Sequence, residues 1–97
     1  MTESSTAASE PTDIEVTHQP DRSTYEVTVA GELVGRADYV AEGDNVVFTH
    51  TIVQPTYRGR GIAGRLVEHA VEDVRSKGLH PVGQCWYVAD YLADHPA

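Results

Sequence analysis

The sequence has little cysteine, few basic side chains and no long apolar run. Its single cysteine, Cys85, excludes an internal disulfide framework and fits a reducing compartment. Seven Lys and Arg stand against fifteen Asp and Glu, and the formal net charge of −8 argues against a nucleic-acid partner. No window approaches the roughly 20 apolar residues of a membrane span, and residues 1–20 show no signal peptide. We therefore expect a cytoplasmic protein with no membrane and no nucleic-acid partner.

The chain length and the local composition indicate one small domain preceded by a tail. The 97 residues are 40% apolar, which suits a single modest core. Residues 1–13 are rich in Ser, Thr, Ala and Glu and carry no apolar pattern, so they predict a disordered acidic tail. Alternation of apolar and polar residues begins at residue 14, and we expect the domain to span residues 14–97.

The first half of the domain predicts an antiparallel β-meander. IEVTH and STYEVTVA alternate between apolar and polar residues, and ELVGRADYVAEGDNVVFTHTIV contains two further strand-like runs. Turn signals lie at residues 19–22, 30–32 and 42–45. These runs predict about four strands joined by tight turns.

The second half changes to a helical period. From Arg60 to Lys77 the apolar residues fall within half of the helix circumference at about 100° per residue, which predicts an amphipathic helix. HPVGQCW then predicts a short strand, and YVADYLADH has helical spacing. A strand that follows a strand and a helix favours parallel pairing. The predicted fold class is α+β (α/β): an antiparallel meander, a β-α-β unit and a short C-terminal helix.

A turn rich in glycine and arginine joins the last meander strand to this helix. Gly59, Gly61 and Gly64 spell G-x-G-x-x-G, but a dinucleotide fold would build a parallel sheet mostly after that motif. The G-K-[ST] of a P-loop is absent. The glycines still allow close approach of a ligand, and amides of the first helical turn favour a phosphate or pyrophosphate. A solvated basic turn balanced by nearby carboxylates is the alternative.

The turn and its surroundings resemble a known family. RGRGIA, residues 58–63, is similar to the R-x-x-G-x-[GA] motif of the GNAT superfamily of acetyl-coenzyme A-dependent N-acetyltransferases. Residues 50–96 resemble its minimal single-domain YjdJ-type group, with H-T-x-V, R-G-x-G-I-[AG] and C-x-[FY]-V-x-x-Y-x-x-x-H-P signatures, and the likeness as a whole covers roughly residues 14–96. The resemblance implies a truncated GNAT-like fold and acetyl transfer from acetyl-CoA to an amine. A non-catalytic acyl-CoA-binding module is the alternative.

The resemblance also implies where coenzyme A would bind. The strand backbone at Val53 would contact the pantetheine arm, and the amides from Gly59 to Gly64 would cradle the pyrophosphate. Arg58 or Arg60 would add positive charge at the rim. Acetyl-CoA is the predicted cosubstrate, and no metal is expected. The predicted cofactor-binding residues are Val53, Arg58, Gly59, Arg60, Gly61, Ile62, Ala63 and Gly64.

The catalytic candidates depart from the superfamily pattern. His50 replaces the usual strand acid, and Cys85 ends the following strand. If these strands diverge, His50 and Cys85 can face one cavity, where His50 would serve as base for a nucleophilic thiol. A surface histidine and an inert buried thiol are the ordinary alternative. Tyr91 lies close to where the superfamily carries its acid tyrosine, and Tyr87 competes for that role.

The acceptor is expected to be an amine of a small molecule or a protein. Typical superfamily members have helices between their first strands that form part of the acceptor wall. The segment Ile14–Val53 leaves room only for a meander, so the acceptor site is either open or completed by another chain, as monomer or homodimer. Acidity favours a cationic acceptor such as a polyamine or a Lys-rich segment, although solubility or a high-salt habitat explains it equally well.

Overall fold

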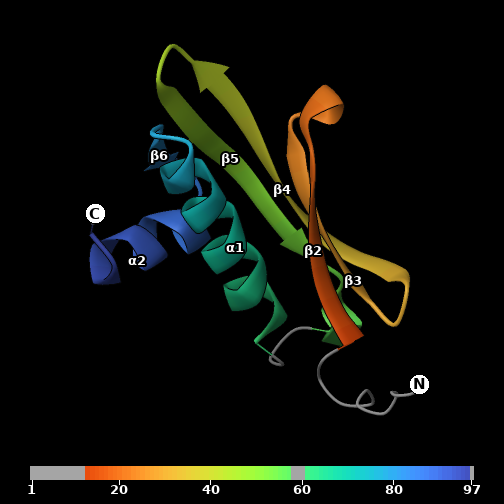
Figure 1. Ribbon diagram of the computed structural model, residues 1–97. Helices are drawn as coiled ribbons and strands as arrows, with labels where there is room; N and C mark the ends of the chain where they lie inside the picture. The colour runs from red at the N-terminus through yellow and green to blue at the C-terminus, as the bar shows by residue number, and fades with distance from the viewer. Residues whose placement is uncertain (1–12, 58–60, 97) are drawn as a thin grey trace, which may run out of the picture.

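The computed structural model describes residues 13–57 and 61–96 (Figure 1). The predicted tail lies outside the described residues except for Asp13, and so do Arg58, Gly59 and Arg60. The described part of the chain has four strands in its first half, β2 (Ile14–Gln19), β3 (Thr24–Val29), β4 (Glu32–Glu42) and β5 (Asn45–Val53). The second half contains α1 (Ile62–Ser76), β6 (His80–Gly83) and α2 (Trp86–Asp94). Short 3-10 turns span Pro20–Arg22 and Pro55–Tyr57.

The strands form one sheet in the order β2-β3-β4-β5-β6. The first four pair antiparallel with their neighbours in sequence, as tight turns require. β6 pairs parallel with β5 after the crossover through α1. The predicted α+β class, with a meander, a β-α-β unit and a short last helix, is therefore confirmed.

The core lies between one face of the sheet and the two helices, which contact each other (Figure 1). Alternate strand residues supply the sheet side, and the apolar stripe of α1 supplies the other side. The helix predicted from Arg60 to Lys77 spans Ile62–Ser76 in the structure. The fully buried residues with the largest side chains are Tyr25, Phe48, Leu66, Val27, Val34, Val67, Val71, Val74 and Val88.

The opposite face of the sheet is open within residues 13–57 and 61–96, because both helices pack on the first face (Figure 1). The short connections leave no α-helix between the described strands of the meander, only the 3-10 turn Pro20–Arg22. Leu33, Val40, Ile52 and Val82 are exposed apolar residues. In the described part of the chain, no helix is both long enough and apolar enough to cross a lipid bilayer.

Candidate functional site

The parallel strands β5 and β6 lie at one edge of the sheet and stop pairing partway along β5. Their pairing ends at Phe48 and Gly83, and the amides of Gln84 and Cys85 both turn to the Phe48 carbonyl, at 2.9 and 3.2 Å. α2 then begins and carries the chain away from the sheet. From Thr49 to Ile52, β5 therefore has no parallel strand beside it in the described part of the chain. The separation forms a wedge whose floor is one edge of β5.

A hollow of about 120 Å³ lies between the end of β5 and the first turn of α1. Gly61 precedes the helix with a φ of +76°, a backbone angle that residues with a Cβ rarely adopt. The first helical bond joins the Arg65 amide to the Gly61 carbonyl at 3.1 Å, so the amides before Arg65 lack an intrahelical acceptor. A Cβ on Gly64 would meet open space. The hollow is lined by Val53, Tyr57, Gly61, Ile62, Ala63, Gly64 and Tyr87.

Five of the eight predicted cofactor residues therefore line one hollow. They are Val53, Gly61, Ile62, Ala63 and Gly64. The other three, Arg58, Gly59 and Arg60, lie outside the described residues. The hollow places the end of β5 beside the open N-terminus of α1, and that N-terminus suits the anionic part of a ligand.

Cys85 lies at the mouth of the wedge as the residue before α2. Its Sγ is 3.1 Å from the Thr51 hydroxyl oxygen. Thr51 pairs with Ala37, a fully buried residue, so Thr51 lies on the sheet face that carries the helices. The partner that the structure gives to the thiol is thus a hydroxyl.

His50 lies on the other face of the sheet. It pairs with Asp38, next to the Thr51–Ala37 pair, and neighbouring strand residues point to opposite faces. A bulge at Thr49 shifts the register from Asp38–His50 to Tyr39–Phe48. The structure therefore does not bring His50 and Cys85 together, in contrast to the shared cavity predicted from the sequence. The bulge is the physical reason, because without it residues 48 and 50 would share the core face.

The His50 ring is oriented by two hydrogen bonds in series. Its Nδ1 is 3.1 Å from the Thr49 hydroxyl oxygen, and that hydroxyl donates to the Asp38 carbonyl at 3.4 Å. Since the hydroxyl proton is directed to the carbonyl, Nδ1 is assigned as the N–H donor. Nε2 then carries the lone pair, and the His50 side chain is exposed on the open side of the sheet. This arrangement can accept a proton from a group that approaches across the open face.

Tyr87 rather than Tyr91 reaches the hollow between the end of β5 and the first turn of α1, named the glycine-turn hollow from here on. Tyr91 stacks on the His95 ring at 4.1 Å, one turn further along α2. Burial, together with the charges of Glu68 and Glu72, raises the pKa of Tyr91. The helical period explains the difference, because residues 87 and 91 are neighbours on one helix but lie a full turn apart along its axis.

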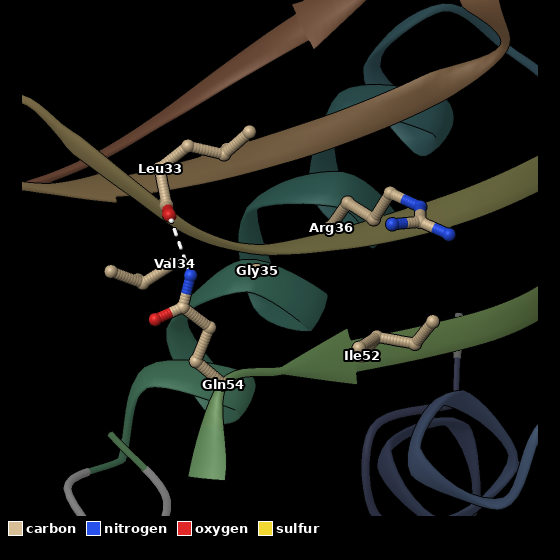
Figure 2. A pocket seen from close by; sticks show the side chains of 6 residues that line it. All are labelled: Leu33, Val34, Gly35, Arg36, Ile52 and Gln54. Carbon is tan, nitrogen blue, oxygen red and sulfur yellow. Dashed lines mark hydrogen bonds between the residues drawn. The ribbon is translucent and has the colours of Figure 1, made fainter. Parts of the chain in front are cut away.

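A second hollow of about 140 Å³ lies on the open face beyond His50 (Figure 2). Arg36 and Ile52 pair across β4 and β5 at one side of this hollow. At its other side, the side-chain amide of Gln54 donates to the Leu33 carbonyl at 3.2 Å. The Arg36 Nε donates to both carboxylate oxygens of Asp38 at 3.1 Å. The hollow is lined by Leu33, Val34, Gly35, Arg36, Ile52 and Gln54.

Sequence reasoning missed Thr49, Thr51 and Tyr57. The two threonines flank His50 in the run THT, a local signal for hydroxyls on both sides of a strand histidine. Tyr57 closes the short 3-10 turn before the glycines and lines the hollow. Within the described residues, no group of three His, Cys, Asp or Glu residues is arranged to hold a metal ion.

Comparison with known proteins identifies relatives over most of the chain. The sequence profile of the GCN5-related N-acetyl-transferase family matches residues 24–97. Protein NATD1 of Gallus gallus is 34% identical over 87 residues, which cover 86% of this chain and 77% of that protein. Protein NATD1 of Danio rerio is 30% identical over 88 residues, which cover 88% of this chain and 79% of that protein.

Solved structures share the fold. The ribosomal-protein-S18-alanine N-acetyltransferase of Escherichia coli has a TM-score of 0.56 at 18% identity, over 75% of this chain and 42% of that one. The PaiA N-acetyltransferase of Thermoplasma acidophilum, in complex with coenzyme A, has a TM-score of 0.55 at 16% identity, over 58% and 35%. N-acetylglutamate synthase of Neisseria gonorrhoeae, complexed with coenzyme A and N-acetyl-glutamate, has a TM-score of 0.61 at 17% identity, over 81% and 21%. The chain spans less than half the length of each of these structures. With this fold and a family profile that matches from β3 to the last residue, the chain belongs to the GCN5-related N-acetyltransferase family.

Proposed function

We propose that the protein transfers an acetyl group from acetyl-CoA to an amine. The observation that carries this proposal is the wedge between β5 and β6, which opens beside the hollow at the start of α1. Two of the solved structures with this fold hold coenzyme A, which supports acetyl-CoA as the cosubstrate. The chain has the strand edge and the open helix start that such a cosubstrate needs.

The residues present fit coenzyme A in two places. The amides of Ile62, Ala63 and Gly64 would donate to the pyrophosphate, and the dipole of α1 favours its charge. The β5 backbone near Val53, which lines the hollow, would contact the pantetheine arm. The open space above Gly64 leaves room for the ligand backbone.

We assign the base to His50, acting on the acceptor and not on Cys85. An amine that arrives across the open face would give its proton to Nε2 of His50 as its nitrogen bonds to the acetyl carbon. The carbon–sulfur bond of the thioester then breaks, and the hydroxyl of Tyr87 protonates the departing thiolate. His50, whose ring is oriented by Thr49, is suited to this role.

A covalent route through Cys85 has less support. A free thiol is mostly protonated at neutral pH and needs a base before it can attack a thioester. Its contact in the structure, the Thr51 hydroxyl, is no base at that pH. We therefore propose direct transfer, with Cys85 as a wall of the acetyl pocket.

The acceptor would lie on the open face, with its amine near His50. The apolar residues Leu33 and Ile52 in the adjacent hollow would contact its carbon skeleton. Because no described helix covers this face, a protein-borne amine such as a Lys side chain could reach it as readily as a small molecule.

Substitution of Gly64 tests cofactor binding. Gly64→Leu projects a side chain into the open space of the hollow without a clash, so the domain should fold while CoA binding weakens at least tenfold, about 1.4 kcal/mol. Calorimetric titration with CoA measures this. Ala93→Leu, at an exposed position on α2 that does not line the hollow, is the matched control and should bind CoA as the parent does. Unchanged affinity in folded Gly64→Leu would refute the site.

Turnover separates an enzyme from a binding module. Incubation of the parent protein with acetyl-CoA and a panel of amines should release free CoA thiol steadily beyond one equivalent. Tight CoA binding, with no release of free CoA thiol in the presence of any amine of the panel, would instead identify a non-catalytic acyl-CoA-binding protein.

A further inference from the structure

Within residues 13–57 and 61–96, the outer edge of β2 presents backbone groups that have no strand partner. β2 is the first strand of the sheet order and pairs only with β3 among the described strands. The Ala30 amide donates to the Asp13 carbonyl at 3.1 Å, which fixes the phase of the antiparallel bonding. Since hydrogen-bonded pairs recur at every second residue, the odd-numbered residues of β2 bond to β3. The backbone N–H and C=O groups that point outward belong to Ile14, Val16 and His18.

This edge lacks the usual protection against strand addition. Natural edge strands are commonly blocked by proline, lysine or a bulge. IEVTHQ contains no proline and no lysine, and its register with β3 is uninterrupted over six residue pairs. The edge is therefore competent to receive another strand.

A groove of about 260 Å³ runs between this edge and α1. Ile14 and Val16 are half-buried on its sheet side. A residue placed opposite Val16 in an added antiparallel strand would point its side chain to the same sheet face, and so into this groove. The groove is lined by Ile14, Val16, Arg65, Glu68, His69 and Glu72.

The charge of the groove favours basic side chains. Among residues 13–57 and 61–96, neither Glu68 nor Glu72 has an ion-pair partner. Two carboxylates and the single guanidinium of Arg65 leave a net charge of −1 with His69 neutral, on a chain of net charge −8. Asp73, one turn further along α1, is by contrast already paired with Lys77 at 2.9 Å.

We propose that the edge of β2 and this groove bind an extended peptide segment that carries Lys or Arg at alternate positions. The peptide adds to the sheet as an antiparallel strand and bonds to the outward groups of Ile14, Val16 and His18. Its basic side chains enter the groove toward Glu68 and Glu72. A second copy of this chain fits less well, because its own β2 would bring Glu15 and no basic side chain except His18. This site is separate from the glycine-turn hollow and does not depend on acetyl transfer.

The probe is a capped heptapeptide, acetyl-Thr-Lys-Thr-Lys-Thr-Lys-Thr-amide, titrated into the full chain. Amide chemical-shift changes in two-dimensional NMR spectra should concentrate at Ile14, Val16 and His18 and on α1 at Glu68 to Glu72. A peptide with Glu in place of Lys should give no such changes. N-methylation of the three Lys amides should abolish binding, because those amides face β2, whereas N-methylation of the Thr amides should leave binding in place.

Protein variants test the same geometry from the other side. Val16→Pro removes an outward N–H and should lose the peptide while it stays folded, whereas Thr17→Pro removes an N–H bonded to β3 and should lower the melting temperature. The double variant Glu68→Gln with Glu72→Gln should weaken peptide binding about fivefold at low salt. Glu42→Gln, in the distal β4–β5 turn, is the charge-matched control and should bind as the parent does.

Two results would overturn the proposal. Shifts that appear at other residues, or that are equal for the Lys and Glu peptides, would show that the edge is not a basic-peptide site. A concentration-dependent dimer in sedimentation analysis that Val16→Pro abolishes would assign the edge to a second copy of the chain. The CoA titration is independent of both readouts, so failure here leaves the proposed acetyl transfer untouched.

Discussion

His18 lies in a polar cluster that fastens β2 to the last turn of α1. Its ring stacks on Tyr25 at 4.2 Å, and its Nε2 is 2.7 Å from the Tyr39 hydroxyl. The Tyr25 hydroxyl and the Lys77 ammonium both donate to Asp73, at 2.6 and 2.9 Å. Nδ1 of His18 is 3.4 Å from the Lys77 nitrogen, so the imidazole accepts there when it is neutral. A proton on that nitrogen would place two donors and two positive charges face to face.

This cluster predicts a loss of stability in mild acid. Burial and the nearby Lys77 charge lower the pKa of His18 below 6.5, and Asp73 opposes them only in part. The folded chain thus binds this proton less readily than the unfolded chain, so its contribution to stability is full above pH 6.5 and declines as the pH falls below it. Urea unfolding should give a lower free energy of unfolding at pH 5.5 than at pH 7.5. His18→Gln should flatten this slope, and an equal slope in the variant would contradict the assignment.

The direct and the covalent transfer routes predict opposite effects for substitutions of His50 and Cys85. With an amine found active in the panel, His50→Gln should lower kcat about a hundredfold, because general-base help is lost. Cys85→Ala should keep kcat within a few fold, since the thiol only lines the pocket. Mass spectrometry after incubation with acetyl-CoA alone should show no acetyl group on Cys85. A hydroxylamine-labile adduct at Cys85, with activity lost in Cys85→Ala, would establish the covalent route instead.

At the scale of elements, the wedge depends on how α2 crosses the end of β6. Gly83 is the last residue of β6, and a Cβ there would lie 2.5 Å from the Ala89 nitrogen and 2.9 Å from the Val88 carbonyl carbon. Both atoms belong to the α2 backbone, which cannot yield as a flexible side chain can. The absence of a side chain at Gly83 therefore lets α2 lie against the strand and turn the chain away from β5.

Gly83→Ala should consequently destabilise the domain by about 2 kcal/mol, within the range for overpacked cores. Chemical denaturation measures the change. Gly64→Ala is the matched control, because its Cβ meets open space in a helix, and it should leave stability equal or slightly higher. An unaltered free energy of unfolding in Gly83→Ala would mean that α2 can shift at no cost.

At the scale of the molecule, the chain covers only one face of its sheet with helices in the described residues. The short meander connections leave the other face to solvent and keep His50 accessible. One hollow therefore lies on each side of β5, the glycine turn on the helix side and the Leu33–Ile52 hollow on the open side. This division allows cosubstrate and acceptor to approach from different faces.

The tail prediction also belongs to the whole molecule. From the composition of residues 1–12 we expect too little apolar burial to offset the entropy of ordering, so their deletion should change the melting temperature by less than about 2 °C. CoA affinity should stay the same in the calorimetric titration. A larger loss in either measurement would show that the tail docks on the domain.

The sequence by itself determined the elements and the position of the glycine turn. The meander, the amphipathic helix and the parallel last strand follow from periodicity and turn residues, which act between near neighbours. The glycines around Gly61 are equally local, because a positive φ is a property of one residue. Five predicted cofactor residues line one hollow in the described part of the chain, and their role in coenzyme A binding, which the family resemblance implies, stays a prediction.

Only the tertiary structure decided which side chains meet. The bulge at Thr49 moves His50 to the open face and Thr51 to Cys85, and a single-residue register shift leaves no mark in apolar periodicity. The choice of Tyr87 over Tyr91 depends on where α2 crosses β6, which is fixed by contact with Gly83 rather than by helix propensity. The exposed edge of β2 likewise follows from strand order, because pairing between distant segments is set by the packed sheet and not by any one of its strands.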